Sequence, residues 1–155
     1  MTARRATHED RGDDEAPEAE DDHGGVHEDR ARGRVGQPVE EPAAGLGKAV
    51  LATRDTAGVE RLLPRDLVAL TPGTNTDHDA LLRELAQVRR DGYAVDRSEN
   101  SADVQCYAVA IVPRHSAVVT DAVSVSVPLF RHTDELAAQT IARLLEVNDR
   151  LRKVS

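Results

Sequence analysis

The stretch that decides the fold spans residues 104–127 and reads VQCYAVAIVPRHSAVVTDAVSVSV. Two runs rich in valine, 104–112 and 118–127, flank the short segment 113–117, which begins with a proline. Short runs of β-branched residues on either side of a turn predict an antiparallel hairpin. Successive side chains of a strand point to opposite faces, so each run presents one set of bulky residues and one set of small ones.

The two faces of the predicted hairpin differ in the size of their side chains. A turn centred on His115 gives three opposed pairs on the small face: Cys106 with Ser124, Ala108 with Ala122, and Val104 with Ser126. The other face carries Tyr107, Val109, Ile111, Val119, Val123, Val125 and Val127. We expect helices to cover the bulky face and a shallow recess, lined by hydroxyl and thiol groups, to remain on the small one. A slip of one residue would separate Cys106 from the serines.

Helical signals surround this hairpin in the sequence. They predict helices from about residue 46, over 59–63 before Pro64, over 77–91 between the N-cap Thr76 and the stop Gly92, and from the N-cap Thr133 onward. Residues 71–75 form a predicted loop, and an extended segment at 93–96 is followed by a polar loop at 97–103. Helices combined with an antiparallel hairpin predict an α+β fold.

Charge divides the chain into two parts. Residues 1–44 hold 13 acidic and 6 basic side chains and no Leu, Ile, Phe, Tyr or Trp, whereas residues 45–155 hold 15 acidic and 14 basic ones. A segment so poor in apolar residues buries too little surface to offset the entropy of ordering it. We therefore expect 1–44 to be a disordered acidic tail and 45–155 to form one domain.

Composition excludes several classes of protein. The single cysteine, Cys106, rules out an intramolecular disulfide and a multi-cysteine zinc site. No apolar run approaches the roughly 20 residues of a membrane helix, and no secretory signal precedes the domain, so we expect a cytoplasmic protein. The net charge of −8 argues against nucleic-acid binding by this chain alone. We expect no cofactor and no metal, because His23 and His27 lie in the flexible tail.

Several segments, in order, resemble the effector-binding domain of IclR-type bacterial transcriptional regulators. They are Gly45–Ala52, Leu70–Thr74 with the helix containing 81–85, Gly92–Asp96, Glu99–Asn100, Val104–Cys106 and Ala122–Pro128. The resemblance extends from Gly45 to the C-terminal helix. It implies a GAF/PAS-like antiparallel sheet with flanking helices, a small organic-acid effector, and a homo-oligomer that adjusts the operator affinity of a linked winged helix-turn-helix.

The resemblance also implies a set of ligand-binding residues. Carried over by position, the set is Gly45, Leu46, Asp96, Val104, Cys106, Ser124 and Ser126. The chemistry suits a carboxylate ligand, since backbone N–H groups at a helix start favour an anion and the polar side chains can fix its remaining groups. Each residue also has a structural interpretation: Cys106 as a small buried hydrophobe, the serines as small residues on a half-exposed face, and Asp96 as a turn residue.

The chain departs from the family before Gly45. No winged helix, linker helix or opening strands are recognisable there, and the acidic segment stands in their place. We therefore expect a truncated regulator with an incomplete sheet, which does not bind operator DNA by itself and tends to associate through its open edge. Two alternatives remain: a cysteine-dependent hydrolase using Cys106 with His115 or His132, and a non-functional remnant that serves only as an oligomerisation module.

Overall fold

The computed structural model describes residues 42–113 and 118–154. Its elements, in chain order, are α2 (Gly45–Leu51), α3 (Thr56–Leu62), α4 (His78–Asp91), β1 (Ala94–Arg97), β2 (Val104–Ile111), β3 (Asp121–Pro128), the 3₁₀ helix η1 (Leu129–Arg131) and α5 (Asp134–Val154). Residues 1–41 of the expected disordered tail lie outside the described residues. Residues 42–44 of that tail are described, and Ala43 among them is buried.

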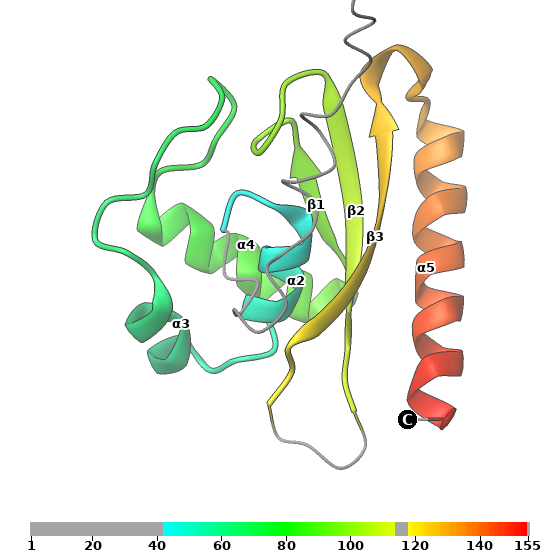
Figure 1. Cartoon of the computed structure of the whole chain (residues 1–155), viewed down its shortest axis with the longest axis horizontal. Coiled ribbons are helices and arrows are strands. Elements are labelled where there is room, and N and C mark those ends of the chain that lie inside the picture. Colours follow the sequence, from blue (N-terminus) through cyan, green and yellow to red (C-terminus); the bar gives the residue numbers. More distant parts are fainter. Residues whose placement is uncertain (1–41, 114–117, 155) are drawn as a thin grey trace, which may run out of the picture. The chain divides into compact units, whose positions relative to one another are not determined.

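The three strands form one antiparallel sheet in the order β1-β2-β3, and the expected hairpin is its β2–β3 half. Helices α2 and α4 lie against one face of the sheet, and the long α5 lies against the other (Figure 1). This layered arrangement confirms the α+β class. Within the described ranges, no helix is long and apolar enough to span a membrane.

Local signals place most helix ends where the sequence predicts them. Gly92 ends α4 in the left-handed region with a φ of 83°, and the hydroxyl of Thr133 accepts a hydrogen bond from the Leu136 amide at the start of α5. The predicted cap of α4 is wrong by one residue. Asp77 caps it instead of Thr76, because its carboxylate accepts a hydrogen bond from the Ala80 amide at 2.7 Å.

The predicted hairpin register is wrong by two residues. Cys106 pairs with Ser126, Ala108 with Ser124, Ala110 with Ala122, and Val104 with Pro128. The strand pairing ends at Ile111 and Asp121, so the centre of the connection lies one position further along the chain than predicted. A shift of two residues leaves every side chain on its predicted face, because strand side chains alternate with a period of two. Cys106, Ser124 and Ser126 therefore share a face as expected.

Both faces of the sheet carry a buried core. The bulky face packs on α5 through Val95, Tyr107, Val109, Val127 and Leu144. The small face packs on α2, α3 and α4, so the expectation that it stays open is wrong for Ala94, Ala108 and Ala110. Helix α2 comes close there because Gly45, Gly47 and Ala49 are small. Val119, expected on the bulky face, precedes β3 and packs into this second core.

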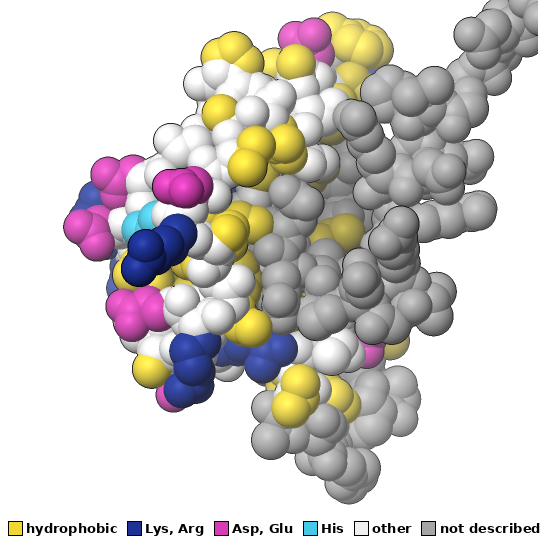
Figure 2. Space-filling view, turned by 60° about the vertical axis from the view of Figure 1, so that its left-hand side comes forward, with side chains coloured by type: hydrophobic (Ala, Val, Ile, Leu, Met, Phe, Trp, Pro, Cys, Tyr) yellow, Lys and Arg dark blue, Asp and Glu magenta, His cyan; other side chains and the backbone are white. Residues whose placement is uncertain are grey.

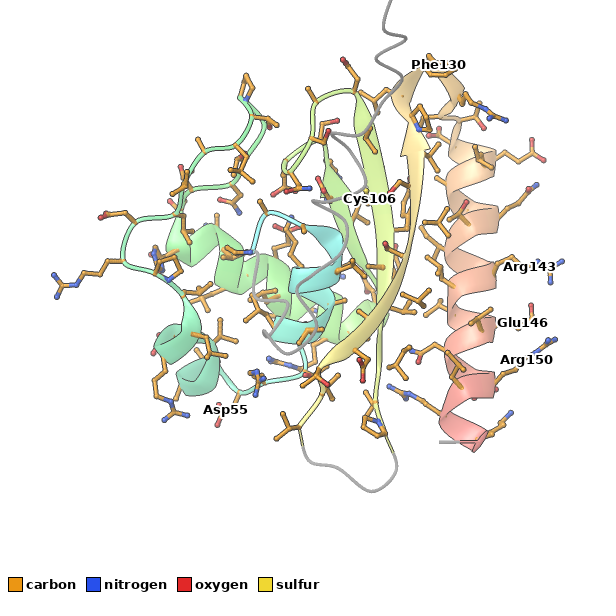
Figure 3. The ribbon with its side chains drawn as sticks, viewed as in Figure 1. Asp55, Cys106, Phe130, Arg143, Glu146 and Arg150 are labelled. Carbon is orange, nitrogen blue, oxygen red and sulfur yellow. The ribbon has the colours of Figure 1, made fainter. Side chains whose placement is uncertain are left out.

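Helix α5 separates its apolar and charged residues. Leu144 is buried, and Leu136, Ile141 and Leu145 pack around it as an apolar stripe. Arg143, Glu146 and Arg150 point away from the sheet (Figure 3) and form ion pairs along the exposed side of the helix. Exposed pairs of this kind contribute little to stability, so α5 is held mainly by its apolar stripe.

Candidate functional site

The candidate site begins where α2 starts above the sheet. Gly45 is buried, and a Cβ atom at this position would lie 3.5 Å from the Cβ of Ala108 and 3.6 Å from those of Asp96 and Cys106. Ala44, which precedes the helix, offers no side chain to cap it. The first turn of α2 is therefore held directly over the strand residues that the sequence analysis singled out.

One row of cross-strand neighbours connects three of those residues. Asp96 on β1 pairs with Cys106 on β2, and Cys106 pairs with Ser126 on β3. The Cys106 sulfur and the Ser126 hydroxyl lie 3.1 Å apart, within hydrogen-bond distance. Ser126 is exposed, Cys106 is half-buried and Asp96 is buried. The row therefore runs from the protein interior to its surface.

Asp96 is the most buried polar member of the row, with 2% of its surface exposed. Its Oδ1 accepts hydrogen bonds from the backbone amides of Glu99 at 2.7 Å and Asn100 at 3.3 Å. Burial raises the pKa of Asp96 above its ordinary value, and these two amides oppose the shift. Such a carboxyl accepts a hydrogen bond from a ligand hydroxyl when ionised and donates one to a ligand carboxylate when protonated.

Cys106 has the environment of an unreactive thiol. Burial raises its pKa, and the nearby Asp96 raises it further, although the hydrogen bond with Ser126 acts in the opposite direction. A thiol needs a lowered pKa to act as a nucleophile at neutral pH. His132 does not supply one, because its Nε2 lies 2.8 Å from the Tyr107 hydroxyl on the α5 side of the sheet. His115, the other candidate partner, lies outside the described residues.

The remaining predicted site residues lie around this row. Ser124 pairs with Ala108 and Val104 pairs with Pro128, so both flank the row on the same face. Leu46 packs against the α2–α4 core. The structure thus brings Gly45, Asp96, Cys106 and Ser126 together, with Ser124 and Val104 on the same face of the sheet and Leu46 next to Gly45 in α2. The contact of any of them with a ligand stays a prediction. Within the described ranges, no group of three or more His, Cys, Asp or Glu residues could hold a metal ion; His23 and His27 lie outside them.

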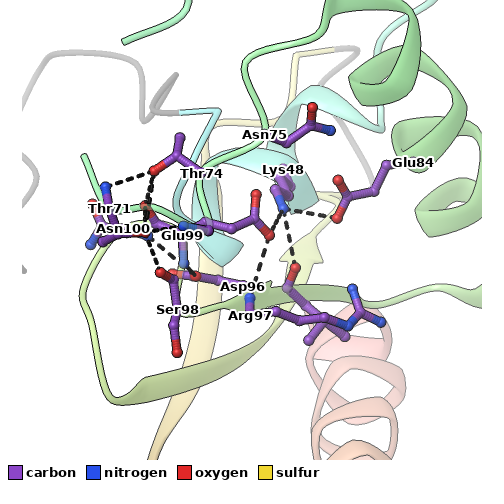
Figure 4. A network of polar contacts seen from close by, with 12 residues as sticks. Lys48, Thr71, Thr74, Asn75, Glu84, Asp96, Arg97, Ser98, Glu99 and Asn100 are labelled. Carbon is purple, nitrogen blue, oxygen red and sulfur yellow. Dashed lines mark hydrogen bonds and ion pairs between the residues drawn. The ribbon is translucent and has the colours of Figure 1, made fainter. Parts of the chain in front are cut away.

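A buried ion-pair network next to the row was missed by the sequence analysis. Lys48 is fully buried, and its Nζ donates to Glu84 Oε1 at 2.8 Å, to Glu99 Oε1 at 2.5 Å and to the Val95 carbonyl at 3.3 Å (Figure 4). A buried ammonium group is tolerated only with such partners. The signal in the sequence was a lysine inside the otherwise apolar helix 45–51.

Two threonines fix the loop that carries Glu99. Thr71 Oγ1 donates to the Ser98 carbonyl and Thr74 Oγ1 to the Glu99 carbonyl, both at 2.6 Å (Figure 4). Lys48 holds the side chain of Glu99 from the other direction. Because the Glu99 amide bonds to Asp96, the network positions the buried end of the candidate site.

Comparisons with known proteins assign the chain to a family. Residues 25–152 match the family of bacterial transcriptional regulator IclR C-terminal domains. The HTH-type transcriptional regulator KdgR of Escherichia coli K12 is 32% identical over 116 residues, which are 74% of this chain and 44% of KdgR. The HTH-type transcriptional regulator Rv1719 of Mycobacterium tuberculosis is 38% identical over 122 residues, which are 77% of this chain and 46% of that protein.

Solved structures show the same architecture. The crystal structure of the C-terminal domain of E. coli KdgR aligns with a TM-score of 0.65 and 30% identity over 73% of this chain and 69% of that one. The inducer-binding domain of PobR from Acinetobacter, crystallised as a double mutant with 3-hydroxybenzoic acid, aligns with a TM-score of 0.67 over 74% of this chain and 66% of that one. At 24% identity, PobR shows the fold alone.

These matches define a class of ligand-sensing regulator domain with a GAF-like α+β fold. The chain belongs to the IclR family, as its C-terminal effector-binding domain, and this confirms the resemblance seen in the sequence. It spans less than half of the length of KdgR and Rv1719. The family is one of regulators rather than enzymes, which sets aside the hydrolase alternative.

Proposed function

We propose that residues 45–155 bind a small organic acid at the row Asp96–Cys106–Ser126 and thereby act as the sensing part of a transcriptional regulator. The observation that carries the proposal is the position of Gly45 directly above Asp96 and Cys106. The carboxyl of Asp96 is buried, and its pKa is raised by that burial. Small-molecule sites combine an apolar lining with a few well-placed polar groups. This row supplies a carboxyl, a thiol and a hydroxyl, and Ser124 beside it supplies a second hydroxyl.

DNA contact, in this proposal, belongs to a winged helix-turn-helix outside residues 45–155. The charge of residues 45–155 supports this part, since their 15 acidic and 14 basic side chains leave no excess of positive charge to neutralise phosphates. On the face formed by α3, α4 and the loop between them, basic and acidic side chains are interspersed (Figure 2).

We further propose that the domain self-associates, because β3 has a paired neighbour on only one side within the described part of the chain.

Thermal unfolding of the full chain with a panel of small organic acids tests the proposal. The panel includes 3-hydroxybenzoate, because the PobR domain was crystallised with it. A bound acid at 100 times its dissociation constant stabilises the folded state by about 2.7 kcal/mol. Asp96→Asn and Ser124→Ala should each weaken binding by about 1–3 kcal/mol, because each removes a polar contact with the ligand.

Asp103→Asn is the matched control for Asp96→Asn. Asp103 lies in the same loop region but is exposed, and its positive φ of 60° is one that asparagine adopts readily. It should leave the affinity unchanged. If no acid shifts the melting temperature, the oligomerisation-only alternative takes precedence. If Asp96→Asn and Asp103→Asn behave alike, the ligand lies elsewhere.

A further inference from the structure

A second hollow lies away from the row, where α2, α4 and α5 end. Its volume is about 400 Å³, within the range of roughly 300–1,000 Å³ that small-molecule sites occupy. None of the seven residues predicted to contact the effector lines it. Ala49 of α2, Ala52 just after it, Val88 of α4 and Ala110 of β2 supply an apolar wall.

The hollow exists because the sheet is narrower at this end. Strand β1 begins at Ala94, which pairs with Ala108, so β2 continues past it to Ala110 without a partner on that side. Gly92 turns the chain just before β1, and a Cβ atom there would lie 3.4 Å from Leu145 of α5. Helices from both sides of the sheet, α2, α4 and α5, therefore contribute residues to the lining of this space.

Two polar features of the hollow point to a ligand. Asn148 of α5 is 7% exposed, it lines the hollow, and its Oδ1 has no hydrogen-bond partner. A buried amide oxygen is unfavourable unless a donor reaches it. Arg89 also lines the hollow, and its guanidinium group is held in place by hydrogen bonds to the carbonyls of Ala52 at 2.9 Å and Arg54 at 2.5 Å.

The charge of the lining has one sign. The charged residues that line the hollow, among those the structure describes, are Arg89 and Arg152, and no carboxylate lines it. Guanidinium groups favour carboxylates, because their planar N–H groups match carboxylate oxygens. The lining thus combines an apolar wall, an unpaired acceptor and positive charge.

We propose that this hollow is a second binding site, for a compact organic acid that carries a hydroxyl or amino group beside its carboxylate. The carboxylate lies at Arg89, the hydroxyl or amino group donates to Asn148 Oδ1, and the apolar body packs on the alanines and Val88. The site uses none of the residues of the proposed effector row, so the two proposals fail independently.

A pair of matched acids tests the role of Asn148. Isothermal titration calorimetry of the full chain compares 3-phenyllactate, which has the hydroxyl group, with 3-phenylpropanoate, which lacks it. We expect 3-phenyllactate to bind about tenfold more tightly, because a hydrogen-bond donor meets a buried unpaired acceptor. In Asn148→Leu the two acids should bind equally, while the melting temperature rises because an unpaired polar group has left the interior.

Two further variants locate the acid. Thr53→Trp places a large ring at the exposed edge of the hollow and should abolish binding of 3-phenyllactate. Arg89→Gln should weaken it at least fivefold, whereas Arg90→Gln, the adjacent exposed arginine that does not line the hollow, should not. Equal affinities of the two acids in the unmodified chain, or no binding at millimolar concentration, would overturn the proposal. So would binding that Asp96→Asn abolishes and Thr53→Trp leaves intact.

Discussion

On the face of the sheet under α2, the residues in contact with the helix are as small as Ala94 and Ala108; on the face under α5, they are as large as Tyr107 and Val109. Small side chains bring the first turn of α2 so near the strands that a Cβ atom at Gly45 would be in van der Waals contact with them. Large side chains on the α5 side bury more apolar surface. The first face is therefore suited to holding polar groups in fixed positions, and the second to stabilising the fold.

The largest effect is expected from breaking the ion-pair network on the α2 side. Lys48→Ala leaves the carboxylates of Glu84 and Glu99 without their shared cation, and the Glu99 side chain is only 7% exposed. Removing one partner of a buried ion pair costs about 3–5 kcal/mol. Urea unfolding measures this loss in the free energy of unfolding.

Lys153→Ala is the control for Lys48→Ala. Lys153 also pairs with a carboxylate, that of Asp149, but its side chain is 66% exposed. Its removal should change stability little. Lys48→Met combined with Glu99→Gln should recover part of the loss, because the more buried of the two carboxylates, that of Glu99, is then replaced by a neutral amide. A small loss for Lys48→Ala would mean that water replaces the lysine and that the network does not stabilise this face.

Substitutions of opposite kind should sharpen the contrast between the two faces. Leu144→Ala on the α5 side removes a side chain that is 4% exposed and should cost about 2–5 kcal/mol through the cavity it leaves. Ala108→Val on the α2 side should cost about 1–3 kcal/mol through crowding, since the Cβ of Ala108 lies 3.5 Å from the Cβ position of Gly45. Differential scanning calorimetry of both variants provides the comparison.

The reverse pattern would contradict that account of the two faces. If Ala108→Val stabilised the protein, the space under α2 would be larger than the contacts at Gly45 indicate. Leu129→Ala serves as the control for Leu144→Ala, because Leu129 is 42% exposed and should tolerate truncation with a much smaller loss.

The pH dependence of stability tests the electrostatics of the α2 side. Burial raises the pKa of Asp96 above 3.8, so the folded state binds this proton more tightly than the unfolded state does. Stability contributed by Asp96 is therefore lost as the pH rises from 3.8 through the raised value. Relative to the unmodified chain, Asp96→Asn should become more stable across that interval in thermal unfolding.

Asp149→Asn should show the opposite sign. The hydrogen bond from Lys153 lowers the pKa of this exposed carboxyl on α5, so its contribution is present above 3.8 and disappears as the pH falls through the lowered value. The variant should lose stability relative to the unmodified chain as the pH rises. If both variants changed in stability in the same direction as the pH rises, Asp96 would ionise as easily as a surface carboxyl.

The smallest effect on stability is expected at the sheet edge. Val125 of β3 is 41% exposed, and a lysine there should hinder edge-to-edge pairing between copies of the chain. Val147→Lys on α5 is the matched control, since Val147 is 43% exposed. Sedimentation velocity should show less self-association for Val125→Lys alone, with stability within about 0.5 kcal/mol for both. If Val125→Lys and Val147→Lys self-associated equally, the contact between copies of the chain would not involve the edge of β3.

The positions of helices and strands followed from local signals in the sequence. Gly92 and Thr133 predicted helix ends because a left-handed turn and an N-cap depend on neighbouring backbone atoms alone. Alternation in the valine-rich runs predicted which side chains share a face, and this prediction survived a register error of two residues. The resemblance to a family named Asp96, Cys106 and Ser126 among the ligand-binding residues, and in the structure they are cross-strand neighbours.

Tertiary contacts decided what the sequence left open. The register that pairs Cys106 with Ser126 was not specified by alternation, because a shift of two residues keeps every side chain on its face. The choice of α2 as the cover of the small face depended on Gly45 meeting Ala108, which lies 63 positions further along the chain. Lys48 found its partners Glu84 and Glu99 at separations of 36 and 51 residues. Such contacts depend on how distant segments pack, whereas periodicity and capping describe only what lies within a few residues.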